Sequence, residues 1–418
     1  MDDPLPFDLP FRAALDVLRA RHGVLEVDAY DARFADLFGI VGQLTNHDVG
    51  VGPWASSSAS REVASMPAVS HRLAPPHLIG PRRSRAVFDG GVQEAPPSRL
   101  IAVQGGAVLR LSGIPVVLDG MTALSDLSGV HAPLLHCYDV DVAGRLAQAQ
   151  RVEGPALLLM SEIGDGNYCH FLLDELPRLA LTDDAGGLTV VICAIDEPGR
   201  NAVRHEALRL AGVRRVIELG PHEALRADTL LVPTATHDMH HPAFKGAPWA
   251  CRWLRATIGV AALARQAPPE PEQRYATRLY VGRGDAASRR LVNENALLAR
   301  LAPLGFVAVT MAGRSLIEQA ALFARAEVIV GLHGAALANI VFCAPGTRLL
   351  EIYAPGFGNA AYGLMAAALA MPYASHVAEP GRMELEYDDT TLIVPAFWRE
   401  AEPWLRAATR AAAQPVVP

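Results

Sequence analysis

The chain has few cysteines, a single lysine and no long apolar run. Its five cysteines are scattered through 418 residues without a CxxC pair, so the sequence indicates neither a zinc site nor a disulfide framework, and a reducing compartment fits. No uninterrupted apolar run reaches the ~18 residues that a membrane-spanning helix needs. The N-terminal segment MDDPLPFDLPF is acidic and broken by prolines, unlike a signal peptide. We therefore expect a cytoplasmic protein whose contact with the membrane, at its inner face, is at most peripheral.

Several familiar motifs are missing as well. No GxGxxG follows a strand-like run, which disfavours NAD or FAD, and there is no Walker A sequence. No GxSxG elbow occurs, which disfavours a hydrolase of that type. The net charge of −7 makes non-specific nucleic-acid binding unexpected. The basic residues are almost all arginine, with Lys245 the single lysine, and the planar fork of arginine suits phosphate oxygens.

What the chain does contain is a regular alternation of strand-like and helix-like segments. Between about residues 154 and 258, and again between 278 and 370, short apolar runs alternate with helical patterns, which is typical of parallel sheets with crossover helices. Short runs at 100–118, separated by glycines, indicate antiparallel hairpins. The sequence predicts an α/β protein with two Rossmann-like domains that face each other across a ligand-binding cleft.

Composition sets the expected domain boundaries. Segment 267–273 (APPEPEQ) combines proline and charge without apolar periodicity, as linkers do. The first 95 residues are irregular in pattern, with a helix predicted only at 11–22. The expected parts are an irregular, β-containing N-terminal extension (1–95), a first Rossmann-like domain with preceding short strands (96–266), a second Rossmann-like domain (274–400) and a C-terminal tail (401–418).

The stretch 326–339 (AEVIVGLHGAALAN) is the first candidate for a ligand site. Val328–Val330 predicts a strand buried on both faces. His333, Gly334 and Ala335 then turn into small residues that can start a helix. The unpaired N–H groups and partial positive charge of a helix start suit a phosphate or pyrophosphate. A tight strand-to-helix turn with an incidental histidine explains the same residues, and both interpretations stay open.

A histidine and a carboxylate four residues apart form the second candidate. His170 and Asp174 follow a glycine-rich loop and share one face of a helix predicted at 167–181. A carboxylate beside an imidazole could deprotonate an acceptor hydroxyl. A helix-surface pair with no catalytic task is the alternative.

Arginines and a strand carboxylate complete the candidates. Arg283 directly follows a strand predicted at 278–282, and Arg290 lies near the next helix start, so the two suit a diphosphate. A solvated charged loop has the same composition. Glu351 lies inside the apolar strand predicted at 348–353, where a carboxylate is costly unless it is satisfied. A ribose diol or a buried arginine would satisfy it.

Three longer segments carry these candidates: NYCHFLLDELPRL, RLYVGRGDAASRRLVNENALLARLAPLGF and LIEQAALFARAEVIVGLHGAALANIVFCAPGTRLLEI. Together they resemble the family 61 glycosyltransferases over roughly residues 150–355. The resemblance implies a GT-B fold and inverting transfer from a nucleotide sugar, with no strictly required metal and no cofactor besides the donor. The family includes plant xylosyl- and arabinosyltransferases, protein O-linked N-acetylglucosaminyltransferases and many bacterial members. We therefore expect a glycan, lipid-linked or protein acceptor and a role in bacterial polysaccharide biosynthesis.

The resemblance also assigns residues by position. It places Asp174 or His170 as the base on the acceptor side, with Asn167 and Glu175 beside them. Gly282 stands where the family motif more usually has serine. The expected donor-binding residues are Arg283, Arg290, His333, Gly334, Ala335, Asn339 and Glu351.

The expected mechanism is a single displacement at the anomeric carbon. Asp174, oriented by His170, takes the acceptor proton, while arginines and the helix start after His333 stabilise the leaving diphosphate. The DVD triplet at 139–141 precedes the alternating region, and we expect no metal site there. Two other functions stay open: a nucleotide-sugar epimerase or hydrolase of GT-B-like fold, and a non-catalytic nucleotide-sugar-binding module.

Overall fold

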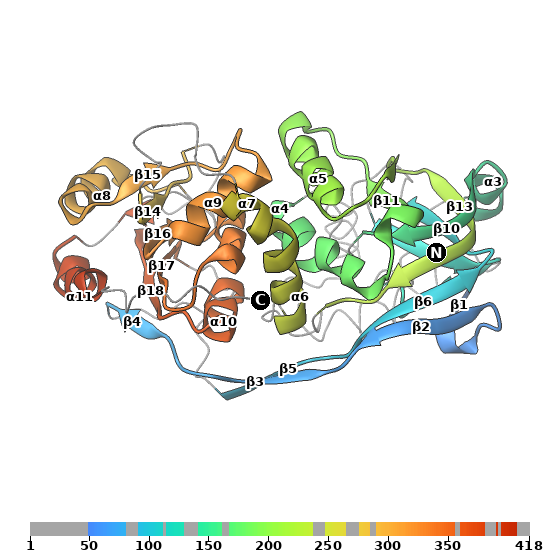
Figure 1. Ribbon diagram of the computed structural model, residues 1–418, viewed down its shortest axis with the longest axis horizontal. Helices are drawn as coiled ribbons and strands as arrows, with labels where there is room; N and C mark the ends of the chain where they lie inside the picture. Colours follow the sequence, from blue (N-terminus) through green and yellow to red (C-terminus); the bar gives the residue numbers. More distant parts are fainter. Residues whose placement is uncertain are drawn as a thin grey trace, which may run out of the picture. The chain divides into compact units, whose positions relative to one another are not determined.

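The structure is a computed structural model of the chain. It describes residues 49–80, 91–111, 114–128, 141–160, 167–236, 247–264, 276–284, 290–355, 360–380, 390–391 and 394–407. The helix predicted at 11–22 and the linker predicted at 267–273 lie outside the described residues. The chain divides into two compact units, unit 1 within residues 1–68 and 96–241 and unit 2 within residues 69–95 and 242–418. Figure 1 shows the ribbon coloured along the sequence.

Unit 1 is built on one mixed sheet. In its parallel part β10 pairs with both β11 and β13, and β11 pairs with β12. These strands confirm the predicted parallel pattern, since β11 (TVVIC) is buried along its whole length. The strands are β10 (Gln150–Leu158), β11 (Thr189–Cys193), β12 (Arg215–Leu219) and β13 (Ala224–Pro233).

The hairpins predicted ahead of this region are present and belong to the same sheet. β7 pairs antiparallel with β8, and β8 with β9. β13 pairs antiparallel with both β6 and β7, which joins the hairpins to the parallel strands. The sequence did not predict this junction, because it depends on a pairing between distant segments. The strands are β6 (Ser98–Gln104), β7 (Ala107–Leu111), β8 (Ile114–Asp119) and β9 (Thr122–Leu124).

Helices of unit 1 follow the strands as the alternation predicts. The longest of those described, α5, begins at Pro198, and the Glu197 side chain caps it by accepting the Arg200 N–H. Its buried face includes Ala207 and Leu208. The helical segments are α3 (Val142–Ala147), α4 (Tyr168–His170), η3 (Phe171–Glu175), η4 (Leu176–Leu181), η5 (Ala185–Gly187) and α5 (Pro198–Leu210).

Unit 2 is built on a parallel sheet in the order β15–β14–β16–β17–β18–β4. The strand predicted at 328–330 is confirmed as β16, and all five of its residues are buried. The strand predicted at 348–353 is confirmed with the same bounds as β17. The strands are β14 (Arg278–Val281), β15 (Val307–Val309), β16 (Val328–Leu332), β17 (Arg348–Tyr353), β18 (Tyr373–Val377) and β4 (His77–Ile79).

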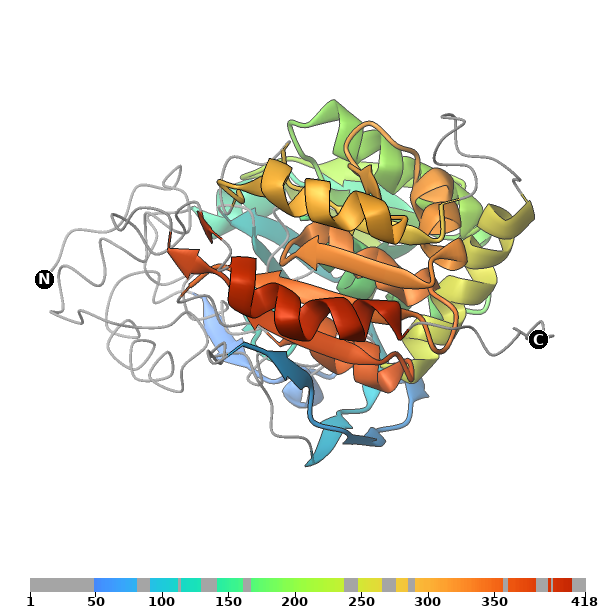
Figure 2. The ribbon, with the colours of Figure 1, turned by 90° about the vertical axis from the view of Figure 1, so that its left-hand side faces the viewer.

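The side chains of successive residues in these strands point to opposite faces of the sheet. Val330 and Ile352 pack in a core cluster with Leu297 of α8 (Glu294–Leu301) and Phe397 of α11 (Val394–Arg406). Figure 2 shows α8 and α11 crossing that face of the sheet. In Figure 1, α9 (Leu316–Arg325) and α10 (Ala361–Ala368) lie on the other side of the strands. Two candidate residues, Glu351 of β17 and His333 directly after β16, have the opposite parity to Ile352 and Val330, so they belong to that other face.

Local start signals in unit 2 were predicted correctly. The capping box expected at α9 is present, since the Ser315 side chain accepts the Glu318 N–H and the Glu318 carboxylate accepts the Ser315 N–H at 2.9 Å. After β16 the chain forms η8 (Ala335–Phe342) with the predicted bounds, although it is a 3-10 helix.

The helical segment after residue 247 belongs to unit 2, whereas the sequence placed it in the 96–266 domain. It runs through α6 (Pro248–Leu254), η6 (Arg255–Gly259) and α7 (Val260–Ala264). The contacts of Arg255 explain why this segment belongs to unit 2. Its guanidinium donates to Val341 O at 2.6 Å and Cys343 O at 2.7 Å, carbonyls at the C-terminal end of η8.

The described part of 1–95 does not form a separate extension. β1 (Gly50–Gly52) pairs with β9, and β2 (Ser60–Met66) pairs with β6, so both belong to unit 1. β4 pairs with β18 in unit 2. β1 and β4 have three residues each, too few for their sequence to carry a periodic pattern. The remaining small elements are η1 (Trp54–Ser56), β3 (Val69–Leu73) paired with β5 (Gly91–Ala95), and β19 (Glu379–Pro380) paired with β20 (Thr390–Thr391).

None of the helices in the described part of the chain combines the length and apolar character needed to cross a bilayer.

Candidate functional site

The histidine–carboxylate pair expected in unit 1 is formed. His170 Nδ1 lies 2.6 Å from Asp174 Oδ2, as the four-residue spacing predicts. The Asp174 side chain is 2% exposed and the His170 side chain 15%. An ionised carboxylate only accepts, so this contact suits a proton on Nδ1, with Nε2 on the opposite side of the ring. His170 is the more exposed member of the pair.

Three kinds of helix follow one another at this pair. Asn167 caps α4, and its side-chain oxygen accepts the Cys169 N–H at 2.9 Å. α4 passes directly into the π-helix η3, and η3 passes into the 3-10 helix η4, which has Pro177 in its first turn. Proline has no N–H to donate, so a regular α-helix cannot continue through it. The π-helical turn, a feature frequent at functional sites, carries Asp174 and the 3%-exposed Glu175.

Arg178 anchors this helix to the sheet of unit 1. Its Nε donates to the Asp174 carbonyl at 2.7 Å, and its Nη1 donates to Met160 O at 3.1 Å and to Pro233 O at 3.4 Å. These last carbonyls lie at the carboxyl ends of β10 and β13. The buried guanidinium therefore fixes the backbone of the pair at the edge where parallel sheets bind ligands. The sequence analysis did not single out Arg178.

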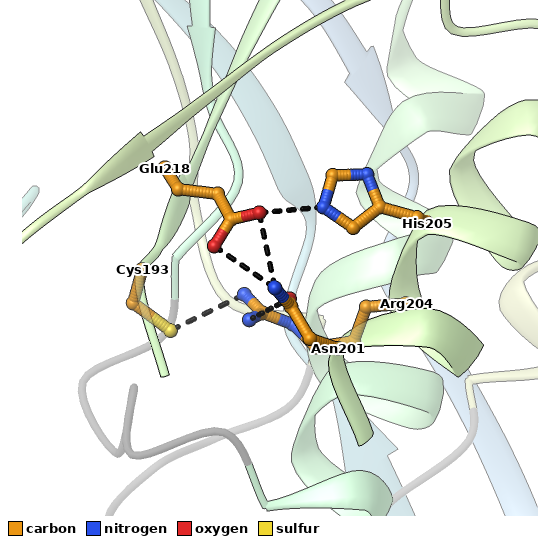
Figure 3. A network of polar contacts seen from close by, with 5 residues as sticks. All are labelled: Cys193, Asn201, Arg204, His205 and Glu218. Atoms are coloured by element: carbon orange, nitrogen blue, oxygen red, sulfur yellow. Dashed lines mark hydrogen bonds and ion pairs between the residues drawn. The ribbon is translucent and has the colours of Figure 1, made fainter. Parts of the chain in front are cut away.

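A polar network on α5 supports the same helix. The Arg204 guanidinium lies over the Phe171 ring of η3, 5.4 Å from its centroid. Figure 3 shows Asn201 and His205 of α5 both reaching Glu218 of β12, with His205 Nε2 at 2.6 Å. Burial opposes ionisation of Glu218, but the hydrogen bonds from His205 and Asn201 hold its pKa below the usual value. The network ties α5 to the sheet and to η3.

In unit 2, His333 directly follows β16 at the carboxyl end of the sheet. Its N–H donates to Ile352 O at 2.8 Å. Its ring stacks on Tyr353 with centroids 5.3 Å apart and packs at a tilt on Tyr362, 5.0 Å away. The residue is only 7% exposed. The histidine is therefore held by backbone and by two aromatic side chains that the sequence analysis did not name.

Glu351 of β17 is the hydrogen-bond partner of His333. Its Oε1 lies 2.5 Å from His333 Nδ1. Its Oε2 accepts from the hydroxyls of Tyr353 at 2.9 Å and Tyr373 at 2.7 Å. The residue is 0% exposed. In the described part of the chain, these protein partners take the place of the ribose or the buried arginine considered from the sequence.

Arg283 and Gly334 meet at the turn after His333. Arg283 Nη1 donates to the His333 carbonyl at 3.3 Å. A Cβ added to Gly334 would lie 1.8 Å from the same nitrogen. Gly334 has an extended φ of 176°, so the glycine is needed here for space and not for its backbone conformation. The structure thus brings together three predicted residues from two distant motifs.

Other predicted residues have different surroundings. Asn339 is fully buried, and its amide donates to Gln319 Oε1 at 3.0 Å and to Ala336 O at 3.0 Å, which ties η8 to α9. Arg290 is exposed ahead of α8. Asp141 caps α3 by accepting the Gly144 N–H at 2.8 Å. The glycine-rich loop before Asn167, and residues 139–140 of the DVD triplet, lie outside the described residues.

Fold and site together define a class. A mixed α/β chain with parallel-rich sheets, and with a histidine–carboxylate pair in each unit, is consistent with a glycosyltransferase. Residues 168–350 match the family model described as Glycosyltransferase 61. This match confirms, over residues 168–350, the resemblance to that family seen in the sequence. No curated protein matches the chain.

The family match supports glycosyltransferase activity, with a sugar donor and a glycan acceptor in general. The matched span contains His170, Asp174, Arg283 and His333, and it ends one residue before Glu351.

Proposed function

We propose that this protein is an inverting glycosyltransferase of the GT-B type that transfers a sugar from a nucleotide sugar to a hydroxyl of a glycan, lipid-linked or protein acceptor. Unit 2 would bind the donor and unit 1 the acceptor. Bacterial polysaccharide biosynthesis, in the cytoplasm or at the inner membrane face, is the proposed setting.

One observation carries the proposal: Arg283, His333 and Gly334 meet at the carboxyl ends of β14 and β16. Ligands of open α/β sheets bind at that edge. A guanidinium and the N–H groups at the start of η8 both suit the oxygens of a diphosphate. The group of Arg283, His333 and Gly334, here called the diphosphate corner, therefore fits the nucleoside diphosphate part of a donor. Arg290 would add a second cation.

The chemistry proposed for unit 1 is general base catalysis. In a single displacement, the acceptor oxygen attacks the anomeric carbon, the bond from that carbon to the diphosphate oxygen breaks, and the acceptor proton moves to His170 Nε2. Asp174, buried and bonded to Nδ1, would hold the ring and stabilise the imidazolium that forms. The leaving diphosphate would be stabilised by Arg283, without a required metal.

A thermal-shift panel of nucleoside diphosphates and their sugar conjugates tests the proposal and identifies the donor. A ligand at 100 times its Kd adds about 2.7 kcal/mol to the stability of the folded state. That corresponds to a rise of several degrees in Tm. We expect one nucleoside diphosphate and its nucleotide sugars to give this rise. A panel in which every ligand leaves Tm unchanged would contradict the proposed function.

Gly334→Ala should weaken nucleoside diphosphate binding about 10-fold, because the new methyl group displaces the Arg283 guanidinium from the turn. Calorimetry with the nucleotide selected by the panel measures this change. Gly284→Ala is the matched control, since a Cβ there meets nothing within 4 Å. Equal affinities for the two variants would remove the argument for close approach at Gly334.

A further inference from the structure

Glu351 combines complete burial with three hydrogen-bond partners. An isolated buried carboxylate is strongly unfavourable, so its partners show what the site requires. Two tyrosine hydroxyls, from Tyr353 and Tyr373, bind one oxygen, and His333 Nδ1 binds the other. The two hydroxyl oxygens also lie 3.1 Å apart, within hydrogen-bond distance of each other. The four side chains form one hydrogen-bond network, in which His333 is the member that follows β16 at the carboxyl end of the sheet.

Strand register explains how the network forms. Glu351 pairs with Gly331 of β16, and alternation places His333, two residues later, on the same face of the sheet. Tyr353 follows Glu351 by two residues, and Tyr373 begins β18 on that face. Gly331 contributes no side chain beside the carboxylate. Three neighbouring strands therefore direct four polar side chains to one point.

The two tyrosines act as hydrogen-bond donors to Glu351. Burial, followed by the negative charge of Glu351, raises the pKa of both Tyr353 and Tyr373 well above the usual value, so both stay protonated and donate. A carboxylate that accepts from two phenols still has acceptor capacity at its other oxygen. That oxygen lies within hydrogen-bond distance of His333 Nδ1, and an ionised carboxylate can only accept from an N–H there.

We propose that Glu351, with Tyr353 and Tyr373, positions His333 by holding its ring in one orientation with a proton on Nδ1, so that Nε2 is the ring atom that addresses the donor diphosphate or its sugar. The nature of that ligand rests on the proposed function. Glu351 acts through His333 and is therefore a positioning residue. Without it, the ring gains rotational and tautomeric freedom that binding must remove, at a cost in affinity.

The first test requires no ligand. The ring nitrogens of His333 are observed by NMR in the full chain labelled with ¹⁵N-histidine, with His333→Gln used for assignment. We expect Nδ1 of the wild type to carry a proton, and we expect Glu351→Gln to change this signature. Tyr373→Phe, which keeps the carboxylate, should shift it less. A wild-type ring protonated on Nε2 alone would overturn the proposal, whether or not the variants fold.

The second test is calorimetry with UDP, GDP, ADP and dTDP as probes. Glu351→Gln and Tyr373→Phe should each weaken the Kd of the bound nucleotide about 10-fold, as expected for loss of a hydrogen bond to a charged group. Tyr280→Phe is the matched control, because Tyr280 makes a similar bond to Glu294, 2.7 Å long, in the same unit. Wild-type affinity in folded Glu351→Gln would contradict the positioning role.

The two tests separate the two proposals. Failure of all four nucleotides to bind the wild type would count against the proposed function, while the NMR signature would still decide the role of Glu351. Nucleotide binding together with an Nε2-protonated His333 would support the function and overturn the positioning.

Discussion

Replacing His170 with glutamine should lower turnover by about 10²–10⁴-fold, the usual contribution of a general base. The structural reason is accessibility: the side chain of Asp174 is 2% exposed, whereas that of His170 is 15% exposed. Glutamine has no nitrogen that can accept a proton near neutral pH. Nucleotide binding should be unchanged, because the diphosphate corner belongs to unit 2. Steady-state kinetics and calorimetry on the same preparation measure both effects.

His205→Gln is the matched control for this change. His205 also bonds a carboxylate at 2.6 Å in unit 1, but it lies on α5 with a side chain that is 43% exposed. We expect it to keep wild-type turnover. Asp174→Asn should also lower turnover, since the Nδ1–H loses its charged acceptor. High turnover in His170→Gln together with loss of activity in Asp174→Asn would instead make Asp174 the base.

Arg283→Ala should weaken nucleoside diphosphate binding by about 10–100-fold, because a guanidinium–phosphate interaction contributes roughly 1.5–3 kcal/mol. The side chain reaches the turn after β16, where its Nη1 contacts the His333 carbonyl. Removing it deletes both the cation and the contact that orders the turn. Turnover at saturating donor should fall as well, since the same charge stabilises the leaving group.

Arg406→Ala is the control for the loss of an arginine in unit 2. Arg406 is 62% exposed and pairs locally with Glu402 on α11. Calorimetry should find its nucleotide affinity equal to that of the wild type. An Arg283→Ala variant that binds as tightly as this control would show that the phosphates lie elsewhere.

Local signals in the sequence predicted several features correctly. The apolar run before His333 predicts β16, the Ser315–Glu318 spacing predicts the cap of α9, and the four-residue spacing predicts the contact between His170 and Asp174. Each of these depends on residues that are close in the chain. Helical and strand periodicity, caps and i,i+4 contacts depend on neighbouring residues, so they can be predicted from the sequence alone.

The partner of Glu351 could not be predicted in this way. Its position inside LLEIY shows only that a buried carboxylate needs a partner. Which partner it has depends on the register of β16, β17 and β18, which brings His333 and Tyr373 to it from 18 and 22 residues away. The one local clue was Tyr353, two residues on and therefore on the same face.

The sequence predicted β structure within residues 1–95, but not the individual strands at 50–79, and it did not predict the helix type at 171–181, for related reasons. β1 and β4 have three residues each, and β2 pairs only with β6 among the described strands, so pairing with β9, β18 and β6 defines them. The π-helical turn arises where the chain must reach Pro177 while Arg178 holds the Asp174 carbonyl. Both depend on tertiary contacts that override local preference.

The most direct measurement of the central claim is the balance of products in a transfer assay. The wild type is incubated with the nucleotide sugar chosen by the thermal-shift panel and a mixture of glycan, lipid-linked and peptide acceptors, and mass spectrometry quantifies nucleoside diphosphate and glycosylated acceptor. We predict equal amounts of the two, with both lost in His170→Gln. Conversion of the nucleotide sugar to an epimer, or to free sugar, with no acceptor modified would contradict the account.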